Sequence, residues 1–220
     1  AGLFQNQKEI NDWIAAGNGI YQADVKPGDV KYVDVNHDGV INASDKVDLG
    51  NGLPKYTFGF NFSLAWKGFD LSANFTGAAG FQIAQSYRDP SSSQANYSRR
   101  ILKRWTGEGT SNEIPRVTYG DVGNWLFSDL YLQDGDYIRL QNLTMGYDFK
   151  KLISWKGLSK MRLYFQVQNL FTLTKYDGMD PEIGSFNGTD GNSSDSWVSG
   201  VDMGYYPHPR TFIVGLNLAF

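Results

Sequence analysis

The stretch Tyr56-Thr-Phe-Gly-Phe-Asn-Phe-Ser-Leu-Ala-Trp66 alternates without interruption between large apolar residues and small or polar ones. Strict alternation over such a length predicts a β-strand with one apolar and one polar face. After Lys67-Gly68, a pair suited to a tight turn, a second alternating segment runs from Phe69 to Thr76. The two segments predict an antiparallel hairpin and favour an all-β fold.

Three further segments alternate in the same way: about 137–149, 161–171 and 211–220. In the first of them, Ile138 and Leu140 are out of phase with the apolar set that starts at Leu143. A β-bulge would explain this slip, and so would a strand end that lies outside a bilayer. The chain is therefore expected to contain five amphipathic strands.

The composition excludes several classes of function. The chain of 220 residues has a formal net charge of -3, whereas a nucleic-acid partner usually requires a basic face. It has no cysteine and only two histidines, His37 and His208, which almost excludes a catalytic triad or a polyhistidine zinc site. Asp177, Asp180 and Glu182 suggest paired catalytic carboxylates, but nothing nearby supplies an aligned second group, so a solvated loop is the favoured interpretation. We expect neither an enzyme nor a nucleic-acid-binding protein.

Alternation alone fits both a soluble sandwich, with its apolar face in the core, and a membrane barrel, with its apolar face in lipid. The connections favour the barrel, because short links at 67–68 and 150–160 alternate with long ones at 77–136 and 172–210. The last alternating segment also closes on an aromatic residue, Phe220, whereas soluble chains usually end in polar, frayed residues. These features predict a transmembrane antiparallel β-barrel.

The alternation of short and long links also predicts a topology. If the final strand descends to the periplasm, the links Lys67-Gly68 and 150–160 are periplasmic. Three long segments are then expected to be extracellular: residues 1–54, 80–136 and 173–209. We accordingly expect residues 1–54 to form an extracellular loop with a metal-binding stretch at 34–45, and residues 55–220 to supply strands and long extracellular loops.

The stretch from Asp34 to Asp45 has the spacing of an EF-hand calcium loop, with Gly39 at the position of the sharp turn. Calcium prefers six to eight hard oxygen ligands on a flexible loop. The expected ligands are the side chains of Asp34, Asn36, Asp38, Asn42 and Asp45 and the backbone carbonyl of Val40. The alternative is an Asx-rich turn without an ion, which such sequences form readily.

Seven stretches, taken in order, resemble one known family. They are Pro27–Ile41, Leu49–Phe60, Lys67–Leu71, Asp136–Tyr147, Gln168–Phe171, Asp180–Glu182 and Tyr206–Phe212. The family is that of the TonB-dependent outer-membrane transporters of the starch-utilisation type, the SusC/RagA group. Each stretch is weak evidence by itself, but the ordered series covers nearly the whole chain.

The resemblance implies a barrel of about 22 strands with an N-terminal plug, of which this chain gives about the last five. It implies location in the outer membrane of a gram-negative bacterium, with contact to outer-membrane lipid. The implied partners are a SusD-like surface lipoprotein and TonB, the latter through an N-terminal region that this sequence lacks. The implied function is import of oligosaccharides or peptides without chemistry on the substrate, and the family pattern includes the acidic loop with its structural calcium.

A hypothesis from another class competes with the transporter. The same residues fit a soluble, secreted β-domain that binds calcium and carbohydrate as an adhesion or scaffold module. A lipid-facing stripe of Phe58, Phe60 and Phe62 would make the protein insoluble without detergent, so the need for detergent separates the two hypotheses.

Overall fold

The computed structural model describes residues 2–86, 99–118, 123–153, 155–183 and 200–220. These residues form two compact units. The loop unit comprises Ala1–Leu49 and Ser86–Leu132, and the sheet unit comprises Gly50–Gln85 and Gln133–Phe220. Residues 86–132 therefore fold with the N-terminal stretch, although more than thirty positions separate them in the sequence.

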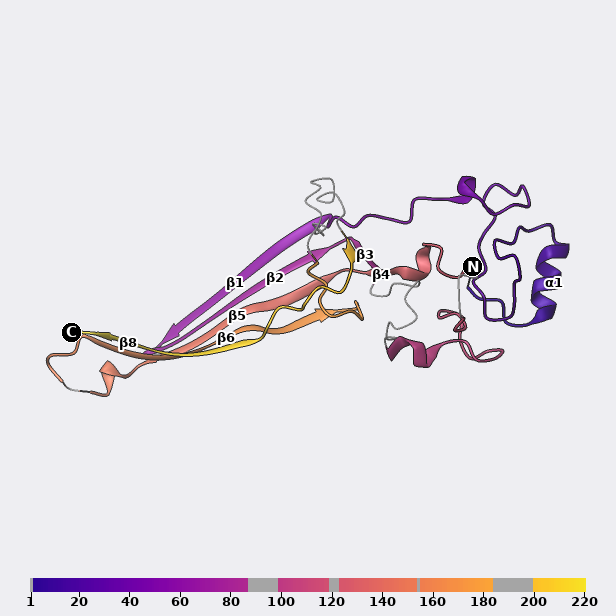
Figure 1. The fold of residues 1–220 in the computed structure, drawn as a ribbon. Coiled ribbons are helices and arrows are strands. Elements are labelled where there is room, and N and C mark those ends of the chain that lie inside the picture. Colours follow the sequence, from indigo (N-terminus) through magenta and orange to yellow (C-terminus); the bar gives the residue numbers. More distant parts are fainter. Residues whose placement is uncertain (1, 87–98, 119–122, 154, 184–199) are drawn as a thin grey trace, which may run out of the picture. The chain divides into compact units, whose positions relative to one another are not determined.

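The sheet unit is built on one five-stranded antiparallel sheet with the order β1-β2-β5-β6-β8 (Figure 1). Its strands are β1 (Tyr56–Trp66), β2 (Phe69–Ala79), β5 (Tyr137–Asp148), β6 (Lys160–Thr174) and β8 (Thr211–Ala219). Each strand of this sheet is paired with the next of these five along the chain. The five strands expected from alternation are confirmed, and β2 and β6 run a few residues further than expected.

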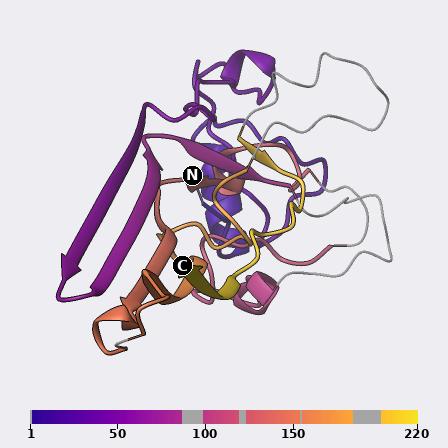
Figure 2. The ribbon, with the colours of Figure 1, turned by 90° about the vertical axis from the view of Figure 1, so that its left-hand side faces the viewer.

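The predicted tight turn between the first two strands is also confirmed. Trp66 pairs with Phe69, and both residues between them have positive φ angles, 48° at Lys67 and 94° at Gly68. A two-residue turn with both φ values positive matches the right-handed twist of the strands that it joins. β1 and β2 consequently lie side by side along their whole length (Figures 1 and 2).

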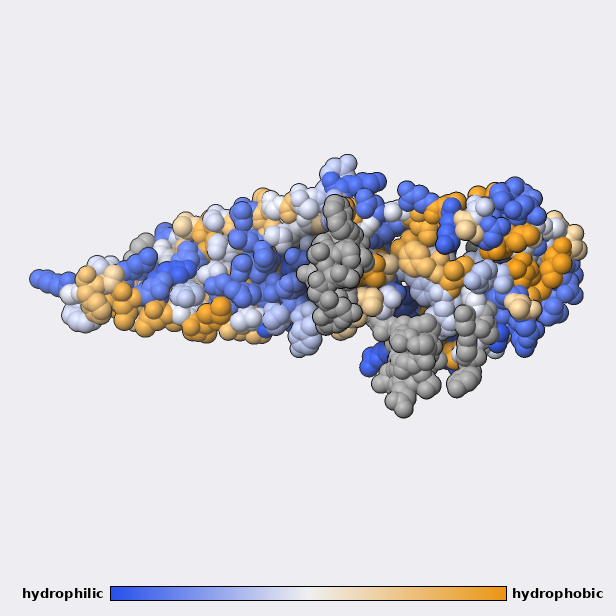
Figure 3. Space-filling model, turned by 45° about the horizontal axis from the view of Figure 1, so that its top comes forward, coloured by the Kyte–Doolittle hydropathy of each residue, from blue (hydrophilic) through white to orange (hydrophobic). Residues whose placement is uncertain are grey.

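The strand register brings the apolar residues of all five strands onto one face. One row across the sheet contains Leu64, Leu71, Met145, Phe165 and Val214. The next row contains Trp66, Phe69, Tyr147, Leu163 and Leu216. Between these rows the side chains point to the opposite face, where residues such as Asp70 and Tyr164 lie. In the space-filling view, apolar residues are exposed along the lower edge of this unit, next to hydrophilic residues (Figure 3).

A β-bulge in β5 explains the slip in phase seen in the sequence. Asn142 pairs with Asn74 of β2, whereas Leu140 pairs with the adjacent residue Phe75, so Gln141 is the extra residue. A bulge turns the following side chains to the other face of the sheet. Leu140 therefore joins the apolar face, and Arg139 moves to the polar face.

A second, three-stranded sheet with the order β4-β3-β7 belongs to segments that were expected to be loops. Its strands are β3 (Gln82–Gln85), β4 (Leu132–Asp134) and β7 (Val201–Asp202). A small buried cluster of Ala78, Phe81, Ile83 and Tyr176 accompanies it. Runs of two to four residues are too short for alternation to reveal, which is why the sequence did not predict them.

The remaining connections contain short 3-10 helices. They are η1 (Ala43–Asp45), η2 (Arg99–Lys103), η3 (Asp129–Tyr131) and η4 (Phe149–Lys151). η1 closes the stretch predicted to bind calcium, because its N-cap is Asn42 and its last residue is Asp45.

The loop unit has a small apolar core. Its helix α1 (Gln7–Ala15) begins at Asn6, whose side chain accepts a hydrogen bond from the Glu9 N–H. The buried apolar residues are Leu3, Phe4, Ile10 and Val30. Beside them the fully buried Asp29 binds Arg116 at 2.6 Å and Asn124 at 2.8 Å, so its charge is paired within the unit.

Candidate functional site

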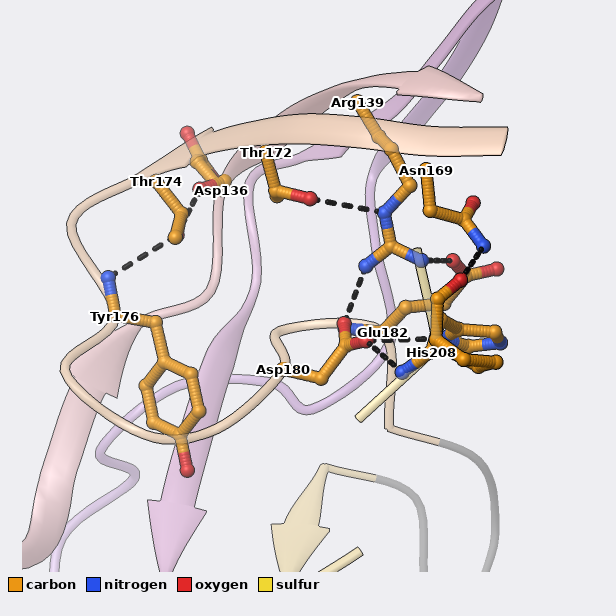
Figure 4. A network of polar contacts seen from close by, with 10 residues as sticks. Asp136, Arg139, Asn169, Thr172, Thr174, Tyr176, Asp180, Glu182 and His208 are labelled. Carbon is orange, nitrogen blue, oxygen red and sulfur yellow. Dashed lines mark hydrogen bonds and ion pairs between the residues drawn. The ribbon is translucent and has the colours of Figure 1, made fainter. Parts of the chain in front are cut away.

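Four polar side chains from distant parts of the sequence meet at the loop end of the large sheet (Figure 4). Arg139 comes from β5, Asp180 and Glu182 from the segment after β6, and His208 from the segment before β8. We call these four residues the Arg139 cluster. Three of the stretches that resemble the transporter family contain its members, so the structure brings those stretches together.

Arg139 lies at the centre of the cluster and is 3% exposed. Its Nη2 donates to Asp180, its Nη1 donates to Glu182 Oε2 at 2.8 Å, and its Nε donates to Thr172 Oγ1 at 3.0 Å. The planar guanidinium offers several donors in a fixed geometry, so one side chain can bind three acceptors at once. The buried positive charge is thereby matched by two carboxylates.

Asp180 connects the segment after β6 with the segment before β8. It accepts hydrogen bonds from the backbone N–H groups of Glu182 at 2.9 Å and His208 at 3.0 Å, and His208 Nδ1 lies 2.9 Å from it. Burial favours a higher pKa for this carboxyl, but the hydrogen bonds from His208 and Glu182 and the charge of Arg139 hold the Asp180 pKa below its usual value. Asp180 is therefore a buried, ionised carboxylate, which corrects the expectation of a solvated loop at this residue, whereas Asp177 and Glu182 are exposed as expected.

Further contacts fix the same two segments close by. The Tyr176 hydroxyl donates to Asp202 at 2.6 Å, and Asp202 also accepts from the backbone N–H groups of Gly204 and Tyr205. Asn169, which has a positive φ of 52°, donates to the carbonyl of Pro209 at 3.0 Å. These hydrogen bonds hold the two segments in place beside the Arg139 cluster.

The loop predicted to bind calcium is closed by its own carboxylates. Asp34 accepts from the backbone N–H groups of Asp38 and Gly39, and Asp38 accepts from Val40. Gly39 has a φ of 83°, the left-handed conformation that glycine adopts without strain. The sharp turn expected at this position is therefore present.

Asp45 ties the end of this loop back to its beginning. Its carboxylate accepts from Asn42 N–H at 2.7 Å and from Val35 N–H at 2.9 Å. The bond from Asn42 and then that from Val35 hold the pKa of the Asp45 carboxyl below its usual value. An ionised carboxylate at this place suits either an Asx-rich turn or an oxygen-rich cation site.

Within the described ranges, no three His, Asp or Glu side chains are grouped so as to hold a metal ion. The predicted calcium ligands also include oxygen atoms of another kind, the side-chain amide oxygens of Asn36 and Asn42 and the backbone carbonyl of Val40. Calcium binding at Asp34, Asn36, Asp38, Val40, Asn42 and Asp45 thus stays a prediction.

The helices in the described part of the chain include none that is long and apolar enough to cross a membrane. Among the segments predicted to be extracellular, residues 87–98, 119–122 and 184–199 lie outside the described residues. The placement of 1–54, 80–136 and 173–209 outside the cell stays a prediction.

No family model matches the sequence. Individual proteins do match it. One TonB-dependent receptor of Formosa agariphila is 34% identical over 93% of the chain, and a second is 30% identical over 100% of it. The TonB-dependent receptor SusC of Bacteroides thetaiotaomicron is 29% identical over 91% of the chain. The chain spans only about a fifth of these relatives, 20%, 22% and 18% of their respective lengths.

Solved structures share the fold. The RagAB peptide transporter aligns with 78% of the chain at a TM-score of 0.58 and 23% identity. The RagAB peptide importer in its closed-closed state aligns with 100% of the chain at a TM-score of 0.64 and 21% identity. The resemblance inferred from the ordered stretches is thus confirmed: the chain is homologous, over nearly its whole length, to a segment of the TonB-dependent receptors related to SusC.

Proposed function

We propose that the chain is the C-terminal part of a transporter in the outer membrane of a gram-negative bacterium. Its five long strands would form part of a barrel of about 22 strands. The complete protein would import oligosaccharides or peptides in a TonB-dependent manner, together with a SusD-like surface lipoprotein. The names of the relatives and of the RagAB structures support this proposal, and none of those names denotes an enzyme.

The observation that carries the proposal is the exposure of the apolar face of the sheet. Phe60 is 60% exposed, Phe212 61% and Val214 72%. Leaving such a side chain in water rather than burying it costs about 1.5–3 kcal/mol. An apolar face that extends over five strands needs a cover, and lipid covers it if the strands span a bilayer.

The opposite face has the character of a wet interior. One of its rows contains Asn61, Asn74, Asn142, Gln168 and Thr211. Towards the turn end, Arg162 and Asp70 form an ion pair across β5, with Arg162 Nε 2.8 Å from the Asp70 carboxylate. Polar residues on alternate positions are typical of the lumen side of membrane strands.

Aromatic and basic residues gather at the turn end of the sheet. The Lys67 ammonium lies 5.0 Å from the centre of the Trp66 ring, and Trp155 contacts Phe220 with ring centres 6.0 Å apart. Aromatic rings and lysines concentrate where a bilayer meets water. This end would therefore lie at a membrane surface. Because the links at this end are short, it would be the periplasmic surface, and the loop end with the Arg139 cluster would face outward.

The proposed partners follow from the same placement. Residues 1–54 and the long loops would lie on the outer side, and the lipoprotein would dock there. TonB would act through a region of the receptor outside this sequence. The loop unit would contribute to the extracellular surface, and its residues 34–45 would bind a structural calcium ion.

The calcium proposal is supported by the hydrogen bond from Val35 N–H to the Asp45 carboxylate, which joins the end of the loop to the residue after Asp34. Asp34, Asn36, Asp38, Asn42 and Asp45 would supply side-chain oxygens, and Val40 its carbonyl. The ion would neutralise the carboxylates and stiffen the loop. An extracellular site of this kind works with a dissociation constant of about 10⁻⁴ to 10⁻³ M.

The function is tested in a bacterium that carries the complete gene. We expect the purified full-length receptor to require detergent and to copurify with a SusD-like lipoprotein. Deleting the gene, or tonB, should abolish growth on the same oligosaccharide or peptide source. A receptor that stays soluble without detergent and supports no uptake would instead favour the secreted module that binds calcium and carbohydrate.

A further inference from the structure

Two segments of the sheet unit are fixed to one place on the large sheet. We call them the loop pair: residues 175–183, which follow β6, and residues 203–210, which precede β8. Asp180 contacts both Arg139 of the sheet and His208 of the second segment. A single buried carboxylate thus connects the two loops to each other and to β5.

The contact between Arg139 and Asp180 depends on the β-bulge at Gln141. Counting back from Asn142 on the polar face, regular alternation would place Arg139 on the apolar face. The extra residue reverses the order, so Arg139 pairs with Thr76 and Thr172 on the polar face. The bulge thus directs the buried, charged side chain of Arg139 towards the two loops.

We infer that Arg139 is a positioning residue that anchors the loop pair over the polar face of the sheet and thereby limits the passage along that face. The inference rests on the proposed function to the extent that the polar face lines the path of the solute. Nothing in the names of the relatives or of the matching structures assigns this role.

The contacts explain why one residue controls both loops. Arg139 binds Asp180, Glu182 and Thr172 with separate guanidinium nitrogens. A lysine has one charged nitrogen and cannot reproduce that geometry. When the guanidinium is removed, Asp180 is left buried without its cation, and it escapes this cost by moving into water together with its segment.

The test measures the position of each loop relative to the sheet. The chain has no cysteine, so spin labels can be attached at introduced cysteines in a full-length receptor in which any cysteine outside this chain is replaced by serine. Met179 and Tyr206 lie on the loop pair and are 53% and 89% exposed, and Asn61 lies on the exposed polar face of β1. The label pairs 61/179 and 61/206 report on the two loops separately.

With Arg139 intact, each pair should give one narrow distance distribution. Arg139→Met should abolish the narrow peak for both pairs, and Arg139→Lys should not restore it fully. The matched control is Arg162→Met, which removes the other arginine–aspartate pair on the same face and should leave both peaks unchanged. Asp180→Asn serves as a second, milder variant if Arg139→Met folds poorly.

A folded sheet with unchanged distances in Arg139→Met and Asp180→Asn would overturn the anchoring role. The passage is probed with vancomycin, a bulky hydrophilic antibiotic, and cells with Arg139→Met should become more sensitive to it than cells with Arg162→Met. Broadened distances with unchanged sensitivity would contradict the role in limiting the passage. Failure of the proposed import would appear separately, as a wild-type receptor that supports no uptake while the label distances still report on the loops.

Discussion

The core of the loop unit and the apolar rows of the large sheet differ in how far their apolar side chains are exposed. In the loop unit, Leu3, Phe4 and Ile10 are at most 2% exposed. In the sheet unit, the apolar rows of the large sheet lie on its surface, while Arg139 and Asp202 are 3% and 1% exposed. One short chain therefore contains a unit with a buried apolar core and a sheet whose apolar face is exposed.

This difference shows that mean hydropathy does not reveal whether the apolar side chains of a segment are buried or exposed. Alternating strands contain as many polar as apolar residues, so their mean hydropathy resembles that of a soluble domain. The exposure of the apolar face of the sheet distinguishes the two cases. Substitutions of apolar residues should therefore affect the stability of the two units differently.

The largest effect is expected in the core of the loop unit. Phe4 is buried and packs edge-on against Trp13, with ring centres 6.1 Å apart. Phe4→Ala should destabilise this unit by about 3–5 kcal/mol, because it removes a buried ring and leaves a cavity. Hydrogen exchange of the α1 amides in the full-length protein measures the loss. Phe60→Ala is the matched control on the sheet, and an equal loss of protection there would contradict the contrast between the units.

The next effect concerns the two faces of β1. Phe60→Arg should destabilise the folded receptor by about 2–4 kcal/mol, because a charge in the middle of the lipid face is costly. Asn61→Arg, one residue along, should cost little, since its side chain points to the wet face. The fraction of heat-modifiable, folded receptor on unboiled gels gives the measurement. If both variants lose folded protein equally, the assignment of the faces is wrong.

How far the sequence predicted these features depends on the range of the interactions behind them. The five strands, the Lys67-Gly68 turn and the slip near Leu140 are encoded by neighbouring residues, and period-two alternation revealed them. Helix α1 was missed although local signals for it are present, because Asn6 and Glu9 mark a helix start and Ile10, Trp13 and Ile14 have helical spacing.

The Arg139 cluster was beyond sequence reasoning for a different reason. Its members are separated by about forty residues between Arg139 and Asp180 and by twenty-eight between Asp180 and His208. No local pattern relates positions so far apart, and the direction of Arg139 depends on a single bulge. The only available signal was that all three stretches belong to the series that resembles the transporter family.

A smaller effect is expected at the start of α1. The Asn6 side chain caps the helix through the Glu9 N–H, 2.9 Å away. Asn6→Ala should destabilise the helix by about 1 kcal/mol, and Asn6→Asp should retain most of the stability. Hydrogen exchange of the first-turn amides distinguishes the variants. Equal exchange in wild type and Asn6→Ala would show that the cap contributes nothing.

The smallest effect near neutral pH is expected for the pH dependence of the loop pair's position. The Asp180 pKa is held below its usual value of 3.8. The stabilisation by this carboxylate is therefore complete above that value and is lost as the pH falls through the lower pKa of the folded state. The 61/179 label distance should stay narrow from pH 7 to pH 5 and broaden only below about pH 4. Broadening already near pH 6 would implicate a different group.

The central claim is that the apolar face of the large sheet lies in lipid, and spin labels placed one by one from Tyr56 to Trp66 test it most directly. The full-length receptor is reconstituted in lipid vesicles, and each label is exposed in turn to oxygen, which concentrates in lipid, and to a water-soluble nickel chelate. Oxygen should dominate at Phe58, Phe60, Phe62 and Leu64, and the chelate at Gly59, Asn61 and Ser63, which gives a period of two. Equal access of the chelate to both sets would contradict the claim.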